Sequence, residues 1–394
     1  METLRKVNNC MLYLLILSIT FENWDPLNTS GSLSVAFVIS ILYIFSWTPF
    51  FKLRLNLFIF KNYISFLILF ILTGFISTAL NPEYLIELSQ AYNFRVMTLI
   101  ILMYLIANHF YNDPSLIEKG INVYLISIVL MFLLFSFGIG VSYEQNRLLI
   151  FKENPNIIGV KAVLAFLIVL GKLFSKSINL KQFLNPITLV LPAAIILIFA
   201  TGSRGAFLSI FIGFILILLF KKMSIFRKIV FVVLGVVFTG LTYNYALENN
   251  QILQERLTKS VQSGDTREVL WEGAIKIFEN NPIIGIGFTN LFPEMYKHSG
   301  FFLYPHNVFL YVLATTGLIG FIFYMSFILK VFISLYRSYQ LTKNVTYLVL
   351  FLMIVVNLMK VGGGVNMMLF WFFFALLLAS ALVVNNSKPE AQNL

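Results

Sequence analysis

The sequence predicts an all-α integral membrane protein that crosses the bilayer many times. Apolar residues make up 59% of the 394-residue chain and charged residues only 11%, whereas a soluble domain has about 45–50% apolar and about 25% charged residues. The apolar residues form continuous runs, while the strands of membrane β-barrels alternate apolar and polar residues. The chain has one cysteine and three histidines. A soluble enzyme, a disulfide framework and a cysteine-based zinc site are therefore excluded, and little material remains for a histidine-rich metal centre.

About twelve apolar runs approach the ~20 residues with which a helix crosses the hydrocarbon core. They cover residues 11–21, 33–47, 63–80, 96–110, 121–141, 157–174, 186–200, 206–220, 229–247, 307–332, 347–359 and 365–384. The runs at 11–21 and 347–359 are short and could be re-entrant. The first run follows Arg5 and Lys6 but lacks a small-residue cleavage site, so we expect a retained helix and not a signal peptide.

The charge distribution supports this map. With the N-terminus in the cytoplasm, 17 of the 28 Lys and Arg residues and 4 of the 17 Asp and Glu residues fall on the cytoplasmic side. That side then carries a balance of +13 and the outer side, with 11 cations and 13 acids, a balance of −2. This bias follows the positive-inside rule. It predicts an even number of spans and cytoplasmic termini, and it explains the net charge of +11 without nucleic acid.

The longest polar stretch, Glu248–Pro305, falls on the outer side between two spans. Within it, Asp265–Glu268 has the pattern of a capping box. The apolar positions after this box recur at helical spacing, and they are Leu270, Trp271, Ala274, Ile277 and Phe278. Asn280–Pro282 ends the predicted helix, and Gly285 and Gly287 mark a turn after it. We expect an amphipathic helix that either roofs a cavity on the outer membrane face or packs on its neighbours.

Three outer-side residues are candidates for chemistry. Arg204 lies in the tight connection Thr201–Gly205, and a buried or half-buried arginine at the membrane interface marks a functional site unless it merely snorkels. Arg267 falls in the first turn of the predicted loop helix, where a cation opposes the helix dipole. An anion such as phosphate is expected there, unless the side chain is simply solvated. His306 lies where the loop re-enters the membrane and could transfer a proton, although a lone interfacial histidine is often structural.

Other outer-side cations could widen an anion site. They are Arg147 and Lys152 before Asn154–Asn156, Lys161 at the start of the next span, and Lys360 before Gly362–Gly364. No Walker loop is present, so ATP is not the energy source. The outer side has no Asp-x-Asp pair for a divalent metal and no convincing carboxylate pair for glycoside hydrolysis. We therefore expect no cofactor, no metal and a substrate that is already activated.

A polyprenyl diphosphate sugar fits these requirements, because its lipid lies in the bilayer, its diphosphate at the interface and its glycan outside. Arginines bind phosphate bidentately and would stabilise the diphosphate as it leaves. A histidine would take the proton from the attacking sugar hydroxyl.

Four motifs resemble those of the bacterial O-antigen ligase and polymerase superfamily, over roughly a third of the chain from Thr201 to Gly320. They are Gly202-Ser-Arg-Gly205, Arg267 four residues before Trp271, Asn281-Pro-Ile-Ile-Gly-Ile-Gly287, and His306-Asn307 followed by Gly317-Leu-Ile-Gly320. The resemblance implies a glycosyltransferase-C-like membrane fold and a metal-independent, inverting transfer in a periplasmic cavity. It also implies that Arg204 and Arg267 bind the diphosphate and that His306 activates the acceptor.

The resemblance predicts transfer of an O-antigen polysaccharide from undecaprenyl diphosphate to the lipid A-core oligosaccharide at the periplasmic face of a bacterial inner membrane. We divide the chain into an N-terminal bundle at 1–200, a ligase-like core at 201–320 that includes the loop 248–305, and C-terminal helices at 321–394. Further residues that we expect at the site are Asn307, Trp271, Arg147, Lys152, Asn156 and Lys360. The expected partners are the lipid-linked glycan donor, a lipid A-core or lipid-linked glycan acceptor, and membrane lipids.

Two alternatives remain open. A polymerase would join lipid-linked repeat units with the same donor chemistry. Some polymerases carry two periplasmic arginines, each with a glycine eleven positions later, but Ile215 and Phe278 stand at those positions here, which favours a ligase. An anion transporter of the same superfamily would need polar residues along the mid-membrane path, and the predicted spans are nearly free of them.

Overall fold

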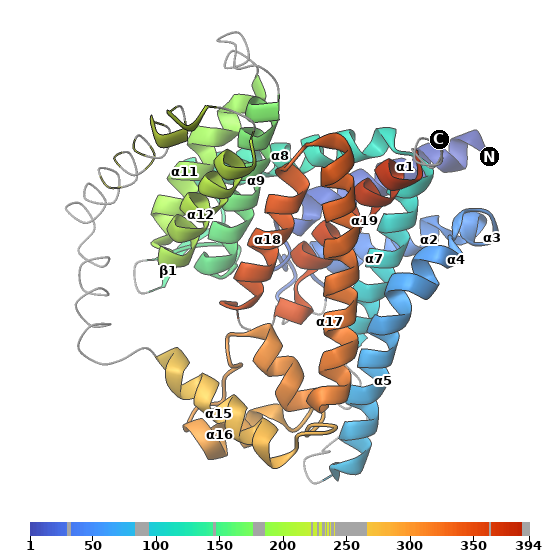
Figure 1. Ribbon diagram of the computed structural model, residues 1–394, viewed down its shortest axis with the longest axis vertical. Helices are drawn as coiled ribbons and strands as arrows, with labels where there is room; N and C mark the ends of the chain where they lie inside the picture. The colour runs from blue at the N-terminus through green and yellow to red at the C-terminus, as the bar shows by residue number, and fades with distance from the viewer. Residues whose placement is uncertain are drawn as a thin grey trace. The chain divides into compact units, whose positions relative to one another are not determined.

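The protein folds into two compact helical units, which we describe separately. Unit 1 comprises Met1–Pro49, Pro114–Gln262 and Tyr339–Met353, and unit 2 comprises Phe50–Asp113, Ser263–Ser338 and Ile354–Leu394. The coordinates are a computed structural model (Figure 1). They describe residues 1–29, 33–82, 94–144, 147–175, 186–221, 224–226, 228–230, 233, 235, 237, 240, 266–361 and 364–387.

Unit 1 is built around helix α9, most of whose apolar surface is buried by neighbouring helices. Its elements are α1 (Glu2–Ile19), α2 (Val35–Ser46), α8 (Ser115–Ser136), β1 (Val141–Glu144), β2 (Arg147–Ile150), α9 (Pro155–Ser175), the short 3-10 helix η4 (Pro186–Leu189), α11 (Val190–Thr201) and α12 (Arg204–Phe220). Helices α11 and α12 both pack on α9. Gly159 allows the close approach of α12, because a Cβ atom there would lie 2.9 Å from the Cβ atom of Ala206.

Unit 2 contains the remaining long helices. Its elements are α3 (Phe51–Arg54), α4 (Leu57–Ile59), the π-helical turn η2 (Phe60–Ile64), α5 (Ser65–Leu80), α7 (Phe94–Asn112), α15 (Thr266–Asn280), α16 (Leu291–Ser299), most of α17 (Val308–Thr342), the end of α18 (Thr346–Leu358), the 3-10 helix η5 (Gly364–Asn366) and α19 (Met368–Asn386). A further 3-10 turn, η1 (Thr48–Phe50), lies at the boundary of the two units. Helices α7 and α19 pack side by side, as do α15 and α16 (Figure 1).

The predicted spans lie on helices in most of the described chain, but the run at 121–141 extends past the end of α8 at Ser136 and includes Val141, the first residue of β1. Among the described residues, six helical segments are long and apolar enough to cross a membrane alone, and shorter apolar helices lie at Pro186–Thr201, Arg204–Phe220 and Thr346–Leu358. The predicted span at 229–247 falls largely outside the described residues. The predominantly helical class is therefore confirmed, whereas the twelve-span count and the glycosyltransferase-C-like arrangement stay predictions.

The sequence analysis missed a β-hairpin. Strands β1 and β2 pair antiparallel, with Val141 opposite Ile150 and Glu144 opposite Arg147. A four-residue strand is too short for an alternating pattern to stand out among long apolar runs. The hairpin matters for the site, because it carries Arg147.

Within each unit, hydrogen bonds join segments that were predicted as outer loops. In unit 1, hydrogen bonds join the predicted outer loops through Asn23 with Glu153 and through Arg147 with Thr201. In unit 2, they join Arg95 with Asn366, and Asn290 with Asn81.

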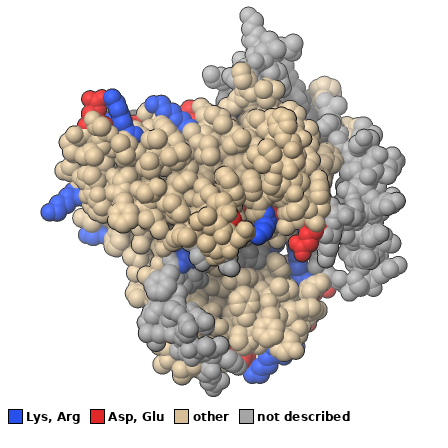
Figure 2. Space-filling model, turned by 180° about the vertical axis from the view of Figure 1, so that it is seen from behind, with Lys and Arg blue, Asp and Glu red and all other residues tan. Residues whose placement is uncertain are grey.

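The surface suits contact with lipid. On the face shown in Figure 2, most of the described surface belongs to residues other than Lys, Arg, Asp and Glu. Large apolar side chains on the long helices are exposed, including Ile76, Leu133 and Ile322. Water-soluble proteins rarely expose so many large apolar groups, whereas a membrane-spanning surface requires them.

Candidate functional site

The connection between α11 and α12 places Arg204 at the first residue of a helix. Helix α11 ends at Thr201, and Gly202 adopts a left-handed conformation with φ of 57°. The Ser203 hydroxyl then caps α12 by accepting a hydrogen bond from the Ala206 amide at 3.4 Å. The tight connection agrees with the prediction. However, Arg204 is exposed, not half-buried as expected, whereas its neighbours Ser203 and Ala206 are buried.

Arg147 and Asn156 hold this connection in place. The Arg147 Nε donates to the Thr201 carbonyl at 3.1 Å, and its Nη2 donates to Asn156 Oδ1 at 2.7 Å. The Ser203 hydroxyl donates to the same Asn156 oxygen at 3.2 Å. Both residues were expected at the site as further anion-site residues. The structure brings them to the Arg204 connection, where their polar groups bind protein atoms.

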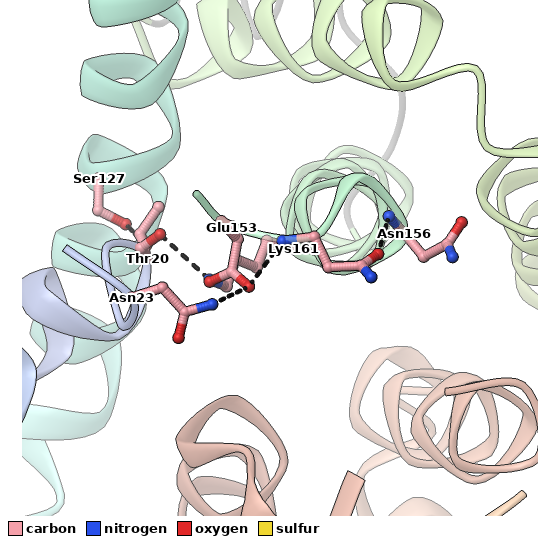
Figure 3. Close-up of polar contacts among 7 residues, drawn as sticks. Thr20, Asn23, Ser127, Glu153, Asn156 and Lys161 are labelled. Atoms are coloured by element: carbon pink, nitrogen blue, oxygen red, sulfur yellow. Dashed lines mark hydrogen bonds and ion pairs between the residues drawn. The ribbon is translucent and has the colours of Figure 1, made fainter. Parts of the chain in front are cut away.

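A buried ion pair lies behind this network in unit 1 (Figure 3). The Lys161 ammonium lies 2.6 Å from Glu153 Oε2, and the Lys161 side chain is 0% exposed. It also donates to the Thr20 carbonyl at 3.1 Å. Lys161 was expected to widen an anion site, but its ammonium is already neutralised by a carboxylate, so the structure assigns it to the core of unit 1.

Hydrogen bonds continue from the ion pair to the Arg204 connection. Glu153 Oε1 accepts from the Asn154 amide at 3.2 Å and from Asn23 Nδ2 at 3.0 Å. Asn154 Oδ1 accepts from the Asn156 amide at 2.8 Å. These hydrogen bonds hold the start of α9 to the segment after α1 and to the connection before α12. Lys152, also expected at the site, is exposed and donates to Asn28 Oδ1 at 3.3 Å.

In unit 2, two of the predicted motifs bind each other through their backbones. Gly317 interrupts helix α17 with φ of 59° and ψ of −163°. The segment Asn281–Gly287 lies against this break. Its hydrogen bonds run from Ile286 N to Ala314 O (3.1 Å), Gly287 N to Thr315 O (2.9 Å), Leu318 N to Pro282 O (2.8 Å) and Ile319 N to Ile283 O (3.2 Å). The break leaves these helical groups without their usual partners, and the segment satisfies them, as an apolar environment demands.

The glycines of this segment are required for close backbone contact. A Cβ atom on Gly285 would lie 2.5 Å from the Thr315 carbonyl carbon, and one on Gly287 would lie 2.5 Å from the Thr78 Cα atom. The Thr78 hydroxyl accepts from the Phe288 amide at 3.0 Å. The segment therefore joins α5 to α17, and these motif glycines have a structural role.

The His306-Asn307 motif begins α17. Asn307 Oδ1 accepts from the amides of Phe309 at 3.0 Å and Leu310 at 3.3 Å, which makes Asn307 the helix cap. His306 immediately precedes this cap, is half-buried and has a φ of 51°. A non-glycine residue in the left-handed region is uncommon, and such strain often accompanies function. Asn307 therefore has a structural role as the helix cap, and the backbone places His306 directly before the start of α17.

Arg267 and Lys360 are both basic residues of unit 2, and the charge of Arg267 acts on Lys360. Arg267 is half-buried in the first turn of α15, which ends at Asn280 as predicted. Burial lowers the pKa of the Lys360 ammonium, and the positive charge of Arg267 lowers it further. Trp271 lies one turn after Arg267, and its indole nitrogen is buried with no hydrogen-bond partner among the described residues. The predicted capping box begins at Asp265, which lies outside the described residues.

The sequence analysis overlooked Arg95 at the start of α7. Its Nε donates to the Asn366 carbonyl at 2.8 Å. Burial raises the pKa of the Tyr304 hydroxyl, while the Asn366 side chain and the charge of Arg95 oppose this rise. Arg95 therefore lies near Tyr304, two residues before His306. Arg95 could have been identified as a candidate from the sequence, because it lies on the predicted outer side at the start of a span.

The structure thus places Arg95, Arg267 and Lys360 in unit 2 and the Arg204 connection in unit 1. Among the described residues, no three His, Cys, Asp or Glu side chains come together as a metal site. A family model described as O-antigen ligase matches residues 187–325, which confirms the resemblance found in the sequence. The chain matches no curated protein.

Proposed function

We propose that this membrane protein, whose residues 187–325 match the O-antigen ligase family, transfers a polysaccharide from undecaprenyl diphosphate to the lipid A-core oligosaccharide. The transfer would take place at the periplasmic face of the inner membrane. The family match supports a glycan transferase that acts on lipid-linked substrates. The choice of a ligase over a polymerase rests on the missing arginine–glycine spacing described above.

One observation supports the donor chemistry above the others. Both motif arginines, Arg204 and Arg267, occupy the first turn of a helix, α12 and α15. The free N–H groups and the dipole at a helix N-terminus attract anions and disfavour cations. An arginine in that position becomes favourable when an anion binds beside it. A diphosphate, which arginine contacts bidentately, is the anion that the family match suggests.

The proposed reaction is a direct displacement at the anomeric carbon of the donor glycan. The acceptor hydroxyl oxygen attacks the anomeric carbon of the donor glycan, while His306 accepts the hydroxyl proton. The bond between the anomeric carbon and the diphosphate oxygen breaks, and its electron pair leaves with undecaprenyl diphosphate. Arg204 and Arg267 stabilise the charge that develops on this leaving group. The proton on His306 then passes to solvent, which restores the site.

The test uses a strain that lacks the gene and is complemented with variants. Arg204→Ala and Arg267→Ala should abolish transfer at an unchanged protein level, and the lysine variants should also fail because lysine does not form bidentate contacts. Lys276→Ala, an exposed residue of α15, is the matched control. His306→Ala should lower the rate by about 10²–10⁴-fold. Normal activity of Arg267→Lys would contradict the proposed phosphate contact.

Lipopolysaccharide and lipid-linked glycans from the deletion strain distinguish the acceptors. Long chains that remain on the polyprenyl carrier and are absent from the core would support the ligase. Single repeat units on the core, with no long chains on either lipid, would replace it with a polymerase. Unchanged profiles would overturn both functions.

A further inference from the structure

We propose that the segment from α16 to the start of α17 lies in the outer interface of the membrane and anchors the outer loop to lipid. The contact is made by four exposed side chains, which we call the apolar patch: Tyr296, Phe301, Phe302 and Leu303. The occupant is the phospholipid layer where headgroups meet acyl chains. This inference is independent of the proposed function, because it concerns how the loop is held and not what the protein transfers.

Helix α16 is held between the ends of two helices of unit 2 that are long and apolar enough to cross a membrane, α5 and α17. At its start, Asn290 Nδ2 donates to the Asn81 carbonyl at 2.8 Å, and Asn81 is the residue that caps the end of α5. After α16, the chain reaches the start of α17 at Val308, five residues after Leu303, so these two residues are at most about 18 Å apart. Both helix ends were predicted on the outer side. The segment between them therefore lies near the outer boundary of the hydrocarbon core.

One side of α16 packs on protein and another side is exposed. Leu291 and Met295 are buried, and α16 packs against α15 (Figure 1). At this contact a Cβ atom on Gly273 would lie 3.0 Å from the Ser299 Cβ atom. Tyr296 is 53% exposed although it carries a large aromatic ring. Helix α16 therefore presents an aromatic side chain beside its packed face.

The apolar patch continues from α16 into the segment that follows it. The rings of Tyr296 and Phe302 stack with their centroids 4.4 Å apart, yet Phe302 is 60% exposed. Phe301 and Leu303, on either side of Phe302, are exposed as well. Single exposed apolar residues are common, whereas a contiguous group of them marks an interaction surface. Aromatic and large aliphatic side chains are typical of helices and segments that lie in the membrane interface.

Lipid suits this patch better than a glycan does. Phe301, Phe302 and Leu303 have no side-chain hydrogen-bond donor or acceptor. A sugar bound against them would lose water from its hydroxyls without gaining partners, which is costly. Acyl chains need no such partners, so the composition of the patch favours the membrane.

The experiment measures the depth of single spin labels on the full-length protein in phosphatidylcholine vesicles. The chain has one cysteine, Cys10, so Cys10→Ser gives a background for Phe302→Cys and, separately, Leu303→Cys. Labels at both positions should collide more often with oxygen, which dissolves in the bilayer, than with a water-soluble nickel chelate. Their depth should be about 5–10 Å into the boundary of headgroups and acyl chains. Both side chains are exposed, so neither substitution removes core packing, and Leu303→Cys also keeps the stacked rings and decides the question if the two labels disagree.

Glu272→Cys in the same background is the matched control. Glu268, Glu272 and Lys276 are exposed and recur at the four-residue spacing of one face of α15, and such a charged face belongs in water. A label at Glu272 should therefore collide more often with the nickel chelate than with oxygen.

Three results would overturn the inference. The first is a label at Leu303 that is as accessible to the chelate as the label at Glu272. The second is shielding from both reagents, because the segment would then be packed against protein. The third is shielding from the chelate only after a soluble glycan is added, which would make the glycan the occupant. The measurement needs no glycan transfer, so its failure and the failure of the proposed function are observed separately.

Discussion

Replacing Gly317 with alanine tests whether the break in α17 is a built part of the fold. Gly317 has φ of 59° and ψ of −163°, a conformation that is essentially restricted to glycine and costs another residue about 1–3 kcal/mol. A Cβ atom there would also lie 2.4 Å from the carbonyl carbon and oxygen of Ile283. Neither of these is a flexible side-chain atom. The segment that carries Ile283 would therefore have to move away.

The size of the effect follows from the bonds at the break. Moving the segment endangers four backbone hydrogen bonds, those of Ile286, Gly287, Leu318 and Ile319, each of which contributes about 0.5–1.5 kcal/mol. With the backbone strain included, we expect a loss of at least about 3 kcal/mol in the free energy of unfolding. Transfer should fall as well, because this segment connects the helix of Arg267 to the helix that follows His306.

The matched control is Gly300→Ala. Gly300 also has a positive φ, 76°, but a Cβ atom there would meet no other atom within 4 Å. It should cost about 1–2 kcal/mol from backbone strain alone. Thermal unfolding of both variants in the same detergent gives the comparison. Equal unfolding midpoints for Gly317→Ala and Gly300→Ala would refute the reasoning that the segment is locked into the break.

Two further predictions concern the polar contacts. Glu153→Gln and Lys161→Met should each lower the free energy of unfolding by about 3–5 kcal/mol, because each leaves a buried partner without its counter-charge. The double variant should recover part of this loss. Strictly additive losses in thermal unfolding would argue against the ion pair. Asn307→Ala should cost about 0.5–2 kcal/mol through the lost helix cap, whereas Asn307→Asp keeps the acceptor oxygen, so equal stabilities for the two variants would count against capping.

Features that depend on neighbouring residues were predictable. The helix α15 and its end at Asn280 follow from apolar spacing and from the proline at Pro282, and both are local signals. The tight connection around Arg204 follows from the glycines that flank it. The match to the O-antigen ligase model over 187–325 includes such local motifs, so the resemblance could be recognised from the sequence.

Features that depend on distant residues were not predictable. Arg95 and Asn366 are separated by 271 positions, and no periodicity relates them. Lys161 resembles an outer-side cation in the sequence, and its burial against Glu153 depends on how the loop before α9 folds back. Contacts between backbone groups are even harder to predict from the sequence, because almost any side chain is compatible with a backbone carbonyl that accepts a hydrogen bond.

The sequence by itself determined that the chain is a helical membrane protein, because hydropathy and charge bias act on each segment independently of its partners. It also determined which motifs the chain carries. Only the tertiary structure decided what each motif residue does within its unit. It made Asn307 a helix cap, Gly317 a docking point for another motif and Lys161 half of a buried ion pair. The reason is physical: the role of a polar group depends on the partner that satisfies it, and folding brings that partner from elsewhere in the chain.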